Sequence, residues 1–225
     1  MIKYIGFDKD GTLIDSNNAI TKAWGKIINE DFGIDTKEAE KVFGVTALGQ
    51  QTSVQLALTL KEHNIDFPND KLFEKANEIA IRMGQEVKAN PFPEVFDILC
   101  DLKKSGYFIF ISSGHQESVV KEDLERTGLI KYVNYYAGVR PTQPEFRKGK
   151  SHFEAAANNF GVDFSEFIKE TVFIGDTPED LSAAKNSGII SIARIGTLSR
   201  EKLLQLGANF VISDLSDLPE ILKSL

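Results

Sequence analysis

The chain has 225 residues, which is long for one compact domain and short for two, so we expect a main domain with a smaller attachment. Hydrophobic residues make up 42% and charged residues 26% of the chain, proportions that exclude a disordered or low-complexity protein. The formal net charge of −7, without a basic stretch, argues against nucleic acid or an anionic membrane as a partner.

Short apolar runs that end abruptly in polar residues recur along the chain, and this pattern predicts buried strands. The three strongest runs are Ile2–Asp8, Tyr107–Ile111 and Thr171–Ile174. Weaker strands are expected at Tyr135–Val139, Ile189–Ala193 and Asn209–Ile212.

Amphipathic helices are predicted between these strands, because apolar residues recur there at spacings of three and four. The first contains Val95, Ile98, Leu99 and Leu102, and the next runs from Phe153 to Phe160 with Gly161 as its stop. Pro178 opens a third helix that Gly188 ends, and the last carries Leu215, Leu218, Leu222 and Leu225. Strands that alternate with helices predict an α/β fold, a parallel sheet with helices on both faces.

Residues 16–90 break this alternation. Apolar stripes at helical spacing cover residues 20–28 and 72–87, while Val54–Leu60 is apolar on more than one face and no strand pattern appears. We therefore expect an all-helical insertion at residues 16–90 within an α/β core made of residues 1–15 and 91–225.

Acidic residues and a serine stand at the ends of the three strongest strands, namely Asp8, Asp10, Ser112, Asp176 and Asp180. In open parallel sheets the ligand site lies beyond these ends, so the side chains should converge there. Converging carboxylates would repel one another by about 4 kcal/mol per pair at 4 Å and an effective dielectric near 20. Such a cluster requires a cation, and carboxylate oxygens select Mg²⁺ over Zn²⁺. Helix caps and turns explain single residues of this set, but not two aspartates spaced two apart at a strand end.

Four segments resemble the motifs of the haloacid dehalogenase superfamily and occur in that family's order. Phe7–Asp15, with the sequence FDKDGTLID, resembles the first motif, and Ile109–Gly114, with the sequence IFISSG, looks like the second. Lys148 fits the third, and Ile174–Asp180, with the sequence IGDTPED, fits the fourth. The resemblance covers nearly the whole chain and implies a Rossmannoid core with a helical cap domain inserted after the first motif.

The resemblance further implies a hydrolase of phosphate esters, similar to the capped phosphatases of the phosphoglycolate phosphatase group. Asp8 would be the nucleophile that becomes an aspartyl-phosphate, and Asp10 would be the general acid and then the general base. Ser112 and Lys148 would bind the phosphoryl oxygens.

The same resemblance implies Mg²⁺ as the cofactor. Its ligands would be Asp8, the backbone carbonyl of Asp10, and Asp176, with Asp180 either a further ligand or just outside them. Asp10 argues against dehalogenation, because a departing halide needs no proton. The family's ion-pumping ATPases share the pattern of Asp8–Thr12, but they require membrane spans and a much longer chain.

Several assignments stay open at this point. The third-motif lysine could be Lys150 in place of Lys148, and Ser113 could take the role of Ser112. Lys9 occupies a position that is usually apolar in soluble members, so its side chain is expected to reach solvent or to favour an anionic substrate. His152 has no partner at metal-ligand spacing and is expected to be a surface or capping residue.

The segment Phe43–Thr52 looks like the cap loop that faces the site. Ala47 stands near the place where relatives such as β-phosphoglucomutase often have an arginine, which favours a phosphatase over a phosphomutase. We expect a small organic phosphate ester as the substrate, with phosphoglycolate and sugar phosphates as the first candidates. The alternatives are a phosphomutase of the β-phosphoglucomutase type and a non-catalytic, phosphate-binding regulatory relative.

Cysteine usage and the chain's start bear on its compartment. Cys100 is the one cysteine, so no internal disulfide can form, which favours a reducing compartment. The start, MIKYIGFDKDG, contains no apolar stretch typical of a secretion signal. We expect a cytoplasmic protein; the oligomeric state is not readable from the sequence.

Overall fold

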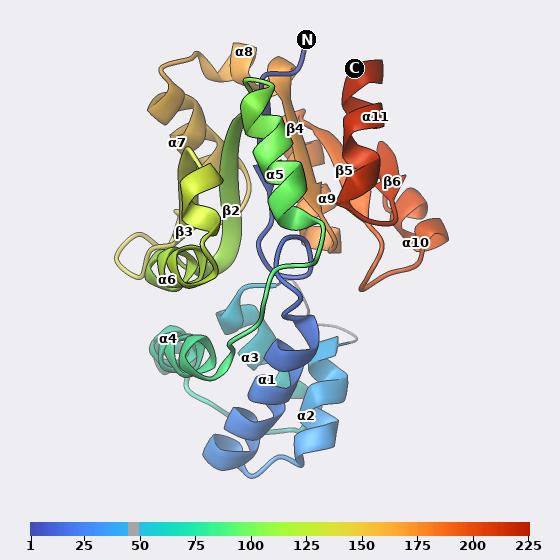
Figure 1. Cartoon of the computed structure of the whole chain (residues 1–225). Helices are drawn as coiled ribbons and strands as arrows, with labels where there is room; N and C mark the ends of the chain where they lie inside the picture. The colour runs from blue at the N-terminus through green and yellow to red at the C-terminus, as the bar shows by residue number, and fades with distance from the viewer. Residues whose placement is uncertain (45–49) are drawn as a thin grey trace.

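A computed structural model of the chain describes residues 1–44 and 50–225. Six strands form one parallel sheet in the order β3-β2-β1-β4-β5-β6, as Figure 1 shows. The strands are β1 (Tyr4–Phe7), β2 (Phe108–Gln116), β3 (Tyr135–Val139), β4 (Thr171–Gly175), β5 (Ile190–Arg194) and β6 (Phe210–Ile212). The order reverses direction at β1, which places the ends of β1, β2 and β4 beside one another.

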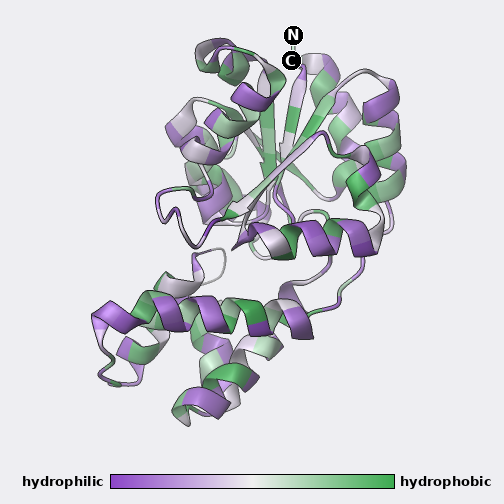
Figure 2. Ribbon diagram, turned by 90° about the vertical axis from the view of Figure 1, so that its left-hand side faces the viewer, coloured by the Kyte–Doolittle hydropathy of each residue, from purple (hydrophilic) through white to green (hydrophobic). Residues whose placement is uncertain are grey.

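Helices cover both faces of the sheet (Figure 2). One face packs against α5 (Val95–Lys104), α6 (Glu117–Thr127) and α11 (Leu218–Ser224). The other face packs against α7 (Lys150–Phe160), α8 (Phe164–Phe167) and α9 (Pro178–Ser187). The remaining short elements are α10 (Arg200–Gln205) and the 3₁₀ turns Leu129–Tyr132, Ile168–Glu170 and Leu215–Asp217. The predicted α/β fold with helices on both faces is therefore confirmed.

The two-residue period of the strands sorts their side chains between the two cores. Ile5 and Phe7 of β1 enter the core under α5 and α6, whereas Tyr4 enters the core under α7 and α8. Gly6 shares the face of Tyr4, and a Cβ there would overlap the rings of Phe110 and Phe173. The glycine lets these two rings close over the middle of the sheet.

Four helices form the part of the chain below the sheet in Figure 1: α1 (Asn17–Phe32), α2 (Thr36–Val42), α3 (Thr52–Glu62) and α4 (Asn69–Glu86). They have an apolar cluster of their own, in which Trp24, Ile27 and Ile79 are completely buried. The Asp15 amide donates to the Asn90 carbonyl at 3.0 Å, so the two connections to the sheet run side by side. The division of the chain into two domains at residues 15/16 and 90/91 stays a prediction.

Some predicted boundaries shift in the structure. The last predicted helix, which included Leu215, begins instead with the 3₁₀ turn Leu215–Asp217, and Pro219 then lies at the start of α11. The strand predicted to end at Ile111 continues as β2 to Gln116. Among the described residues, no helix has both the length and the apolar character that crossing a membrane requires.

Arg194, the last residue of β5, joins three segments next to the ends of the central strands. Its guanidinium donates to the Thr12 carbonyl at 2.6 Å, lies 2.9 Å from the Glu94 carboxylate and stacks 3.5 Å over the Phe92 ring. Only 5% of Arg194 is exposed. This contact set holds the loop after β1 against the start of α5.

We expect Arg194→Met to lower the free energy of unfolding by about 3 kcal/mol, because it removes the buried guanidinium that contacts Thr12 and Phe92 and leaves the partly buried Glu94 carboxylate without its cation. Urea denaturation measures the change. Arg200→Met is the matched control: its guanidinium is exposed and, among the described residues, donates only to the Val211 carbonyl, so a change within about 0.5 kcal/mol is expected. Equal effects of the two substitutions would contradict this role of Arg194.

Candidate active site

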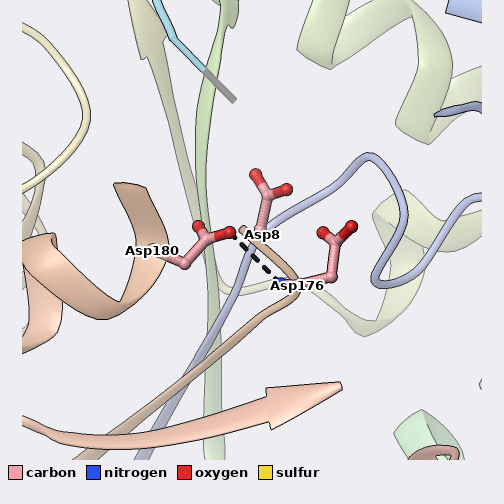
Figure 3. Close-up of side chains that lie close together, drawn as sticks. All are labelled: Asp8, Asp176 and Asp180. Atoms are coloured by element: carbon pink, nitrogen blue, oxygen red, sulfur yellow. Dashed lines mark hydrogen bonds between the residues drawn. The ribbon is translucent and has the colours of Figure 1, made fainter. Parts of the chain in front are cut away.

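Three aspartates converge beyond the ends of β1 and β4 (Figure 3). Asp8 directly follows β1, Asp176 directly follows β4, and Asp180 lies in the first turn of α9. Each offers one carboxylate oxygen, these oxygens lie within 4.8 Å of one another, and all three residues are buried. The predicted convergence of Asp8, Asp176 and Asp180 is thus present in the structure.

The position of Asp180 follows from how α9 begins. Thr177 is the N-cap, and its hydroxyl lies 3.4 Å from the Asp180 amide that donates to it. In return, one Asp180 oxygen accepts hydrogen bonds from the Thr177 amide at 3.0 Å and hydroxyl at 2.6 Å. The Asp176 amide donates to the same oxygen at 3.2 Å, the dashed line of Figure 3. This capping box commits one Asp180 oxygen to the start of α9 and leaves the second oxygen for other partners.

Lys148 supplies the positive charge within this cluster. Its Nζ lies 2.7 Å from Asp8 and 2.6 Å from the second oxygen of Asp180, and only 3% of its side chain is exposed. Burial alone would lower the pKa of Lys148, but Asp180 and Asp8 outweigh burial and raise it. Lys150, the alternative from the sequence, is 67% exposed and pairs with Glu154 at 3.6 Å. The structure brings Lys148, and not Lys150, to the carboxylates.

Asp176 is held by hydrogen bonds from three parts of the chain. One of its oxygens accepts from Asn17 Nδ2 at 3.0 Å and the Thr197 hydroxyl at 2.7 Å, and the other accepts from the Thr12 hydroxyl at 3.2 Å. Thr12 lies within the first motif, but Asn17 and Thr197 were not among the predicted site residues. No sequence pattern marks them, because they reach Asp176 only through the fold.

The carboxylates carry more negative charge than Lys148 neutralises. Burial raises the pKa of Asp176 to about 6, and repulsion from Asp180 contributes to the rise. Burial also raises the pKa of Asp8 well above its usual range; Lys148 opposes the shift, while Asp180 and Asp176 add to it. A divalent cation relieves both causes, and buried carboxylate oxygens are the donors that hard cations prefer. The residues present therefore fit a metal ion of this kind.

Asp10 is not part of the cluster formed by Asp8, Asp176 and Asp180. It does line the same cleft as Asp8. Its carboxylate accepts a hydrogen bond from the Ser16 hydroxyl at 2.6 Å, and Lys9 Nζ lies 2.9 Å away. His115 Nε2 lies 3.7 Å from the same group. Burial would raise the pKa of Asp10, but Lys9, His115 and Ser16 outweigh it and hold the pKa well below its usual range. The expectation that Lys9 reaches solvent is wrong, since only 2% of it is exposed.

Ser112 is completely buried on β2, and its Oγ lies 2.9 Å from His152 Nδ1 on α7. The cleft is lined by the neighbouring Ser113 and Gly114, while Ser112 is not among the lining residues. The structure thus places Ser113, and not Ser112, at the surface of the cleft. His152 is completely buried, so its predicted surface position is wrong. It stands four residues before Ala156 of the buried α7 stripe, a spacing that already marked this face in the sequence.

A cleft of about 580 Å³, a volume that includes its open mouth, lies between the sheet and the helical insertion. Asp8, Asp10 and Lys148 lie on its core side. The insertion contributes Asn17, Ile20, Phe43, Gln50, Thr52, Gln55, Ala80 and Met83. Part of the loop expected to face the site lies here, whereas Ala47 falls outside the described residues.

Curated proteins match this chain over nearly its whole length. A phosphoglycolate phosphatase of Vibrio parahaemolyticus is 26% identical and covers 98% of this chain and 96% of its own. A Clostridium perfringens protein provisionally named as the pyrophosphatase PpaX is 24% identical over the full length of both chains.

Solved structures share the fold. A haloacid dehalogenase-like hydrolase of Streptococcus pneumoniae has a TM-score of 0.76 and 20% identity, with 98% of each chain covered. The β-phosphoglucomutase of Clostridium difficile has a TM-score of 0.74 and 18% identity, covering 100% of this chain and 96% of its own. The family described as haloacid dehalogenase-like hydrolase matches residues 2–188. The chain therefore belongs to the haloacid dehalogenase-like hydrolases.

Proposed function

We propose that this hydrolase is a Mg²⁺-dependent phosphatase that cleaves small organic phosphate monoesters through an aspartyl-phosphate on Asp8. The observation that carries the proposal is the pairing of the buried Asp8 carboxylate with Lys148, 2.7 Å apart, at a cleft bordered by the helical insertion. Phosphatase activity is also what family membership and the names of the relatives support. A carboxylate beside a lysine suits attack on an anionic phosphoryl group, because the lysine offsets the repulsion between the two anions.

In the first step, a carboxylate oxygen of Asp8 attacks phosphorus and forms a P–O bond. The bond from phosphorus to the ester oxygen breaks, and its electron pair stays on the departing oxygen. Asp10 lines the same cleft and gives its proton to that oxygen, so an alcohol leaves. Lys148 and Ser113, which both line the cleft, bind the phosphoryl oxygens as their charge is redistributed.

In the second step, water attacks the phosphorus of the aspartyl-phosphate while Asp10, now a carboxylate, accepts a proton from that water. The P–O bond to Asp8 breaks, inorganic phosphate forms, and Asp8 returns as a carboxylate. Each turnover therefore ends with Asp10 protonated. Because the pKa of Asp10 is low in the free site, this proton leaves with the product and Asp10 takes up another when the next substrate binds. The helical insertion limits the access of other water to the phosphorylated Asp8.

Mg²⁺ would be held by Asp8, Asp176 and the backbone carbonyl of Asp10. When bound, it would supply the charge neutralisation that Lys148 alone does not provide. Asp180 has one oxygen committed to the α9 cap and the other paired with Lys148, so we place it next to the ligands as their support.

The substrate is proposed to be a small molecule, because the cleft that holds Asp8, Asp10 and Lys148 is bordered by the sheet on one side and by the helical insertion on the other. Phosphoglycolate and sugar phosphates are the first candidates. The curated relatives named above act, by their names, on phosphoglycolate and pyrophosphate, so both belong in a substrate panel.

We expect Asp8→Asn to abolish phosphate release, by about 10³-fold or more, because the amide is a poor nucleophile. The measurement is release of inorganic phosphate from p-nitrophenyl phosphate, phosphoglycolate, pyrophosphate, several sugar phosphates and nucleotides, with Mg²⁺ or with EDTA. Release that persists in the mutant or in EDTA would contradict the mechanism. Conversion of a sugar phosphate to an isomer with little net phosphate would instead identify a phosphomutase.

Mg²⁺ should raise the melting temperature, since it binds the assembled carboxylates of the folded chain and not the unfolded one. At 100 times its dissociation constant the gain is about 2.7 kcal/mol, or about 5–10 °C for a chain of this size. Differential scanning calorimetry across a Mg²⁺ titration measures the shift. Asp176→Asn should remove most of it, whereas Asp217→Asn, on the remote 3₁₀ turn before α11, should not. A shift retained in full by Asp176→Asn would place the ion elsewhere.

The two candidate lysines make a matched pair of substitutions. Lys148→Met should lower kcat by about 10²–10³-fold, because it removes the buried cation that contacts Asp8. Lys150→Met should leave kcat within about twofold, because Lys150 is 67% exposed and pairs only at the surface. Steady-state kinetics on the best ester, with circular dichroism to check folding, would decide. The reverse ranking would assign the third motif to Lys150.

A further inference from the structure

Lys9 is a buried cation that the proposed chemistry does not use. It stands between the nucleophile Asp8 and the acid–base group Asp10, and only 2% of it is exposed. Lys9 is one of the largest fully buried side chains in the described part of the chain, alongside Trp24 and Phe7. Its side chain therefore occupies interior space that an apolar side chain could fill.

The Lys9 ammonium is shared by two carboxylates. Its Nζ lies 2.9 Å from Asp10 and 2.7 Å from Asp123 Oδ2. Asp123 belongs to α6, and only 8% of it is exposed. The Lys9–Asp123 ion pair thus links the loop after β1 to α6 on one face of the sheet, across 114 positions of the sequence.

Asp123 is itself held in place by a second cation. Arg126, one turn further along α6, donates to Asp123 Oδ1 at 2.9 Å and to the Ala89 carbonyl at 2.8 Å. Lys9 therefore binds one carboxylate oxygen of Asp123, and Arg126 binds the other. Lys9 in turn has a fixed acceptor on the side away from Asp10.

Stability does not explain why a lysine stands here. Removing an ion pair from water costs several kcal/mol per ion, and replacing such pairs by well-packed apolar side chains is often neutral or stabilising. The group that gains from Lys9 is Asp10, whose carboxylate otherwise has one close hydroxyl partner, Ser16, at 2.6 Å. Proton transfer depends steeply on the position of the acid, because small displacements of a reacting group cost large factors in rate.

We propose that Lys9 is a positioning residue, through which Asp123 of α6 fixes the Asp10 carboxylate where it meets the oxygen of the departing alcohol. This inference rests on the proposed function, since it assigns Lys9 to the proton transfer that Asp10 performs there. Lys9 does not contact the substrate in this role. It acts by restricting the side chain of Asp10.

The dependence of the rate on the leaving group separates this role from a merely structural one. An alkyl phosphate releases a strongly basic oxygen that needs the proton of Asp10, whereas p-nitrophenolate departs without one. The quantity to compare is kcat/KM, which covers the steps up to the first phosphoryl transfer and excludes hydrolysis of the aspartyl-phosphate. Glycerol 3-phosphate and p-nitrophenyl phosphate serve as the two esters.

For Lys9→Met we expect kcat/KM to fall about 10²-fold with glycerol 3-phosphate and less than about threefold with p-nitrophenyl phosphate. The variant is expected to fold, because Asp10 keeps Ser16 and Asp123 keeps Arg126. Arg126→Met is the matched control, because it also removes one cation from Asp123 but leaves the contacts of Asp10 in place. Its kcat/KM with each of the two esters should stay within about threefold of the wild-type value.

Asp123→Asn is the second variant, and it decides the matter where Lys9→Met does not fold. It keeps the shape of the side chain but weakens the hold on Lys9, so the same selective loss is expected at a smaller size, about tenfold or less. Equal losses with the two esters, or no loss with either, would overturn the positioning role. If the wild-type protein hydrolyses neither these two esters nor any ester of the substrate panel in Mg²⁺, the proposed function itself fails, an outcome distinct from equal losses in the variants.

Discussion

The ion pairs of Lys148 with Asp8 and Asp180, 2.7 and 2.6 Å long, are the contacts on which the site depends. Buried carboxylates repel one another and resist ionisation, so Asp8 could not remain charged and ready to attack without a cation at this distance. One lysine does not balance Asp8, Asp176 and Asp180 together. The remaining negative charge is what makes a divalent cation fit, and the same charge makes the folded site sensitive to its removal.

The parallel sheet produces this crowding as a consequence of its strand order. β1 lies between β2 and β4, so the loops that follow these three strands open at one edge. The helical insertion then contributes to the cluster directly, since Asn17 at the start of α1 donates to Asp176 at 3.0 Å. Gly11 makes that approach possible: it has a φ of +76°, and a Cβ there would overlap both Asn17 and Asp176.

The sequence predicted those parts of the molecule whose signals are local. The six strands are short apolar runs that end in polar residues, and the helices α5, α7 and α9 have apolar periodicity with glycine or proline boundaries, so all of them were predicted near their observed positions. Helix α6 was not, because its buried apolar stripe consists of little more than Val120 and Leu124. The error at Lys9 follows from that gap: its partner Asp123 lies on α6, and a buried lysine cannot be expected while its distant carboxylate is unknown. Asn17 and Thr197 were missed for the same reason, as long-range contacts leave no periodic signal.

Asp8 and Asp10 are each paired with a different buried lysine. Lys148 faces the nucleophile and the support residue Asp180, while Lys9 faces the acid–base group and is anchored by α6. Because each lysine also has a carboxylate partner outside the pair Asp8–Asp10, neither is free to move toward the other's aspartate. The two aspartates stand only two residues apart, yet they sit in different charge environments: burial raises the pKa of Asp8, whereas Lys9 and His115 outweigh burial at Asp10. The residue between the two aspartates thus contacts Asp10, while the contact with Asp8 comes from Lys148, so the two groups are held by different cations within one short loop.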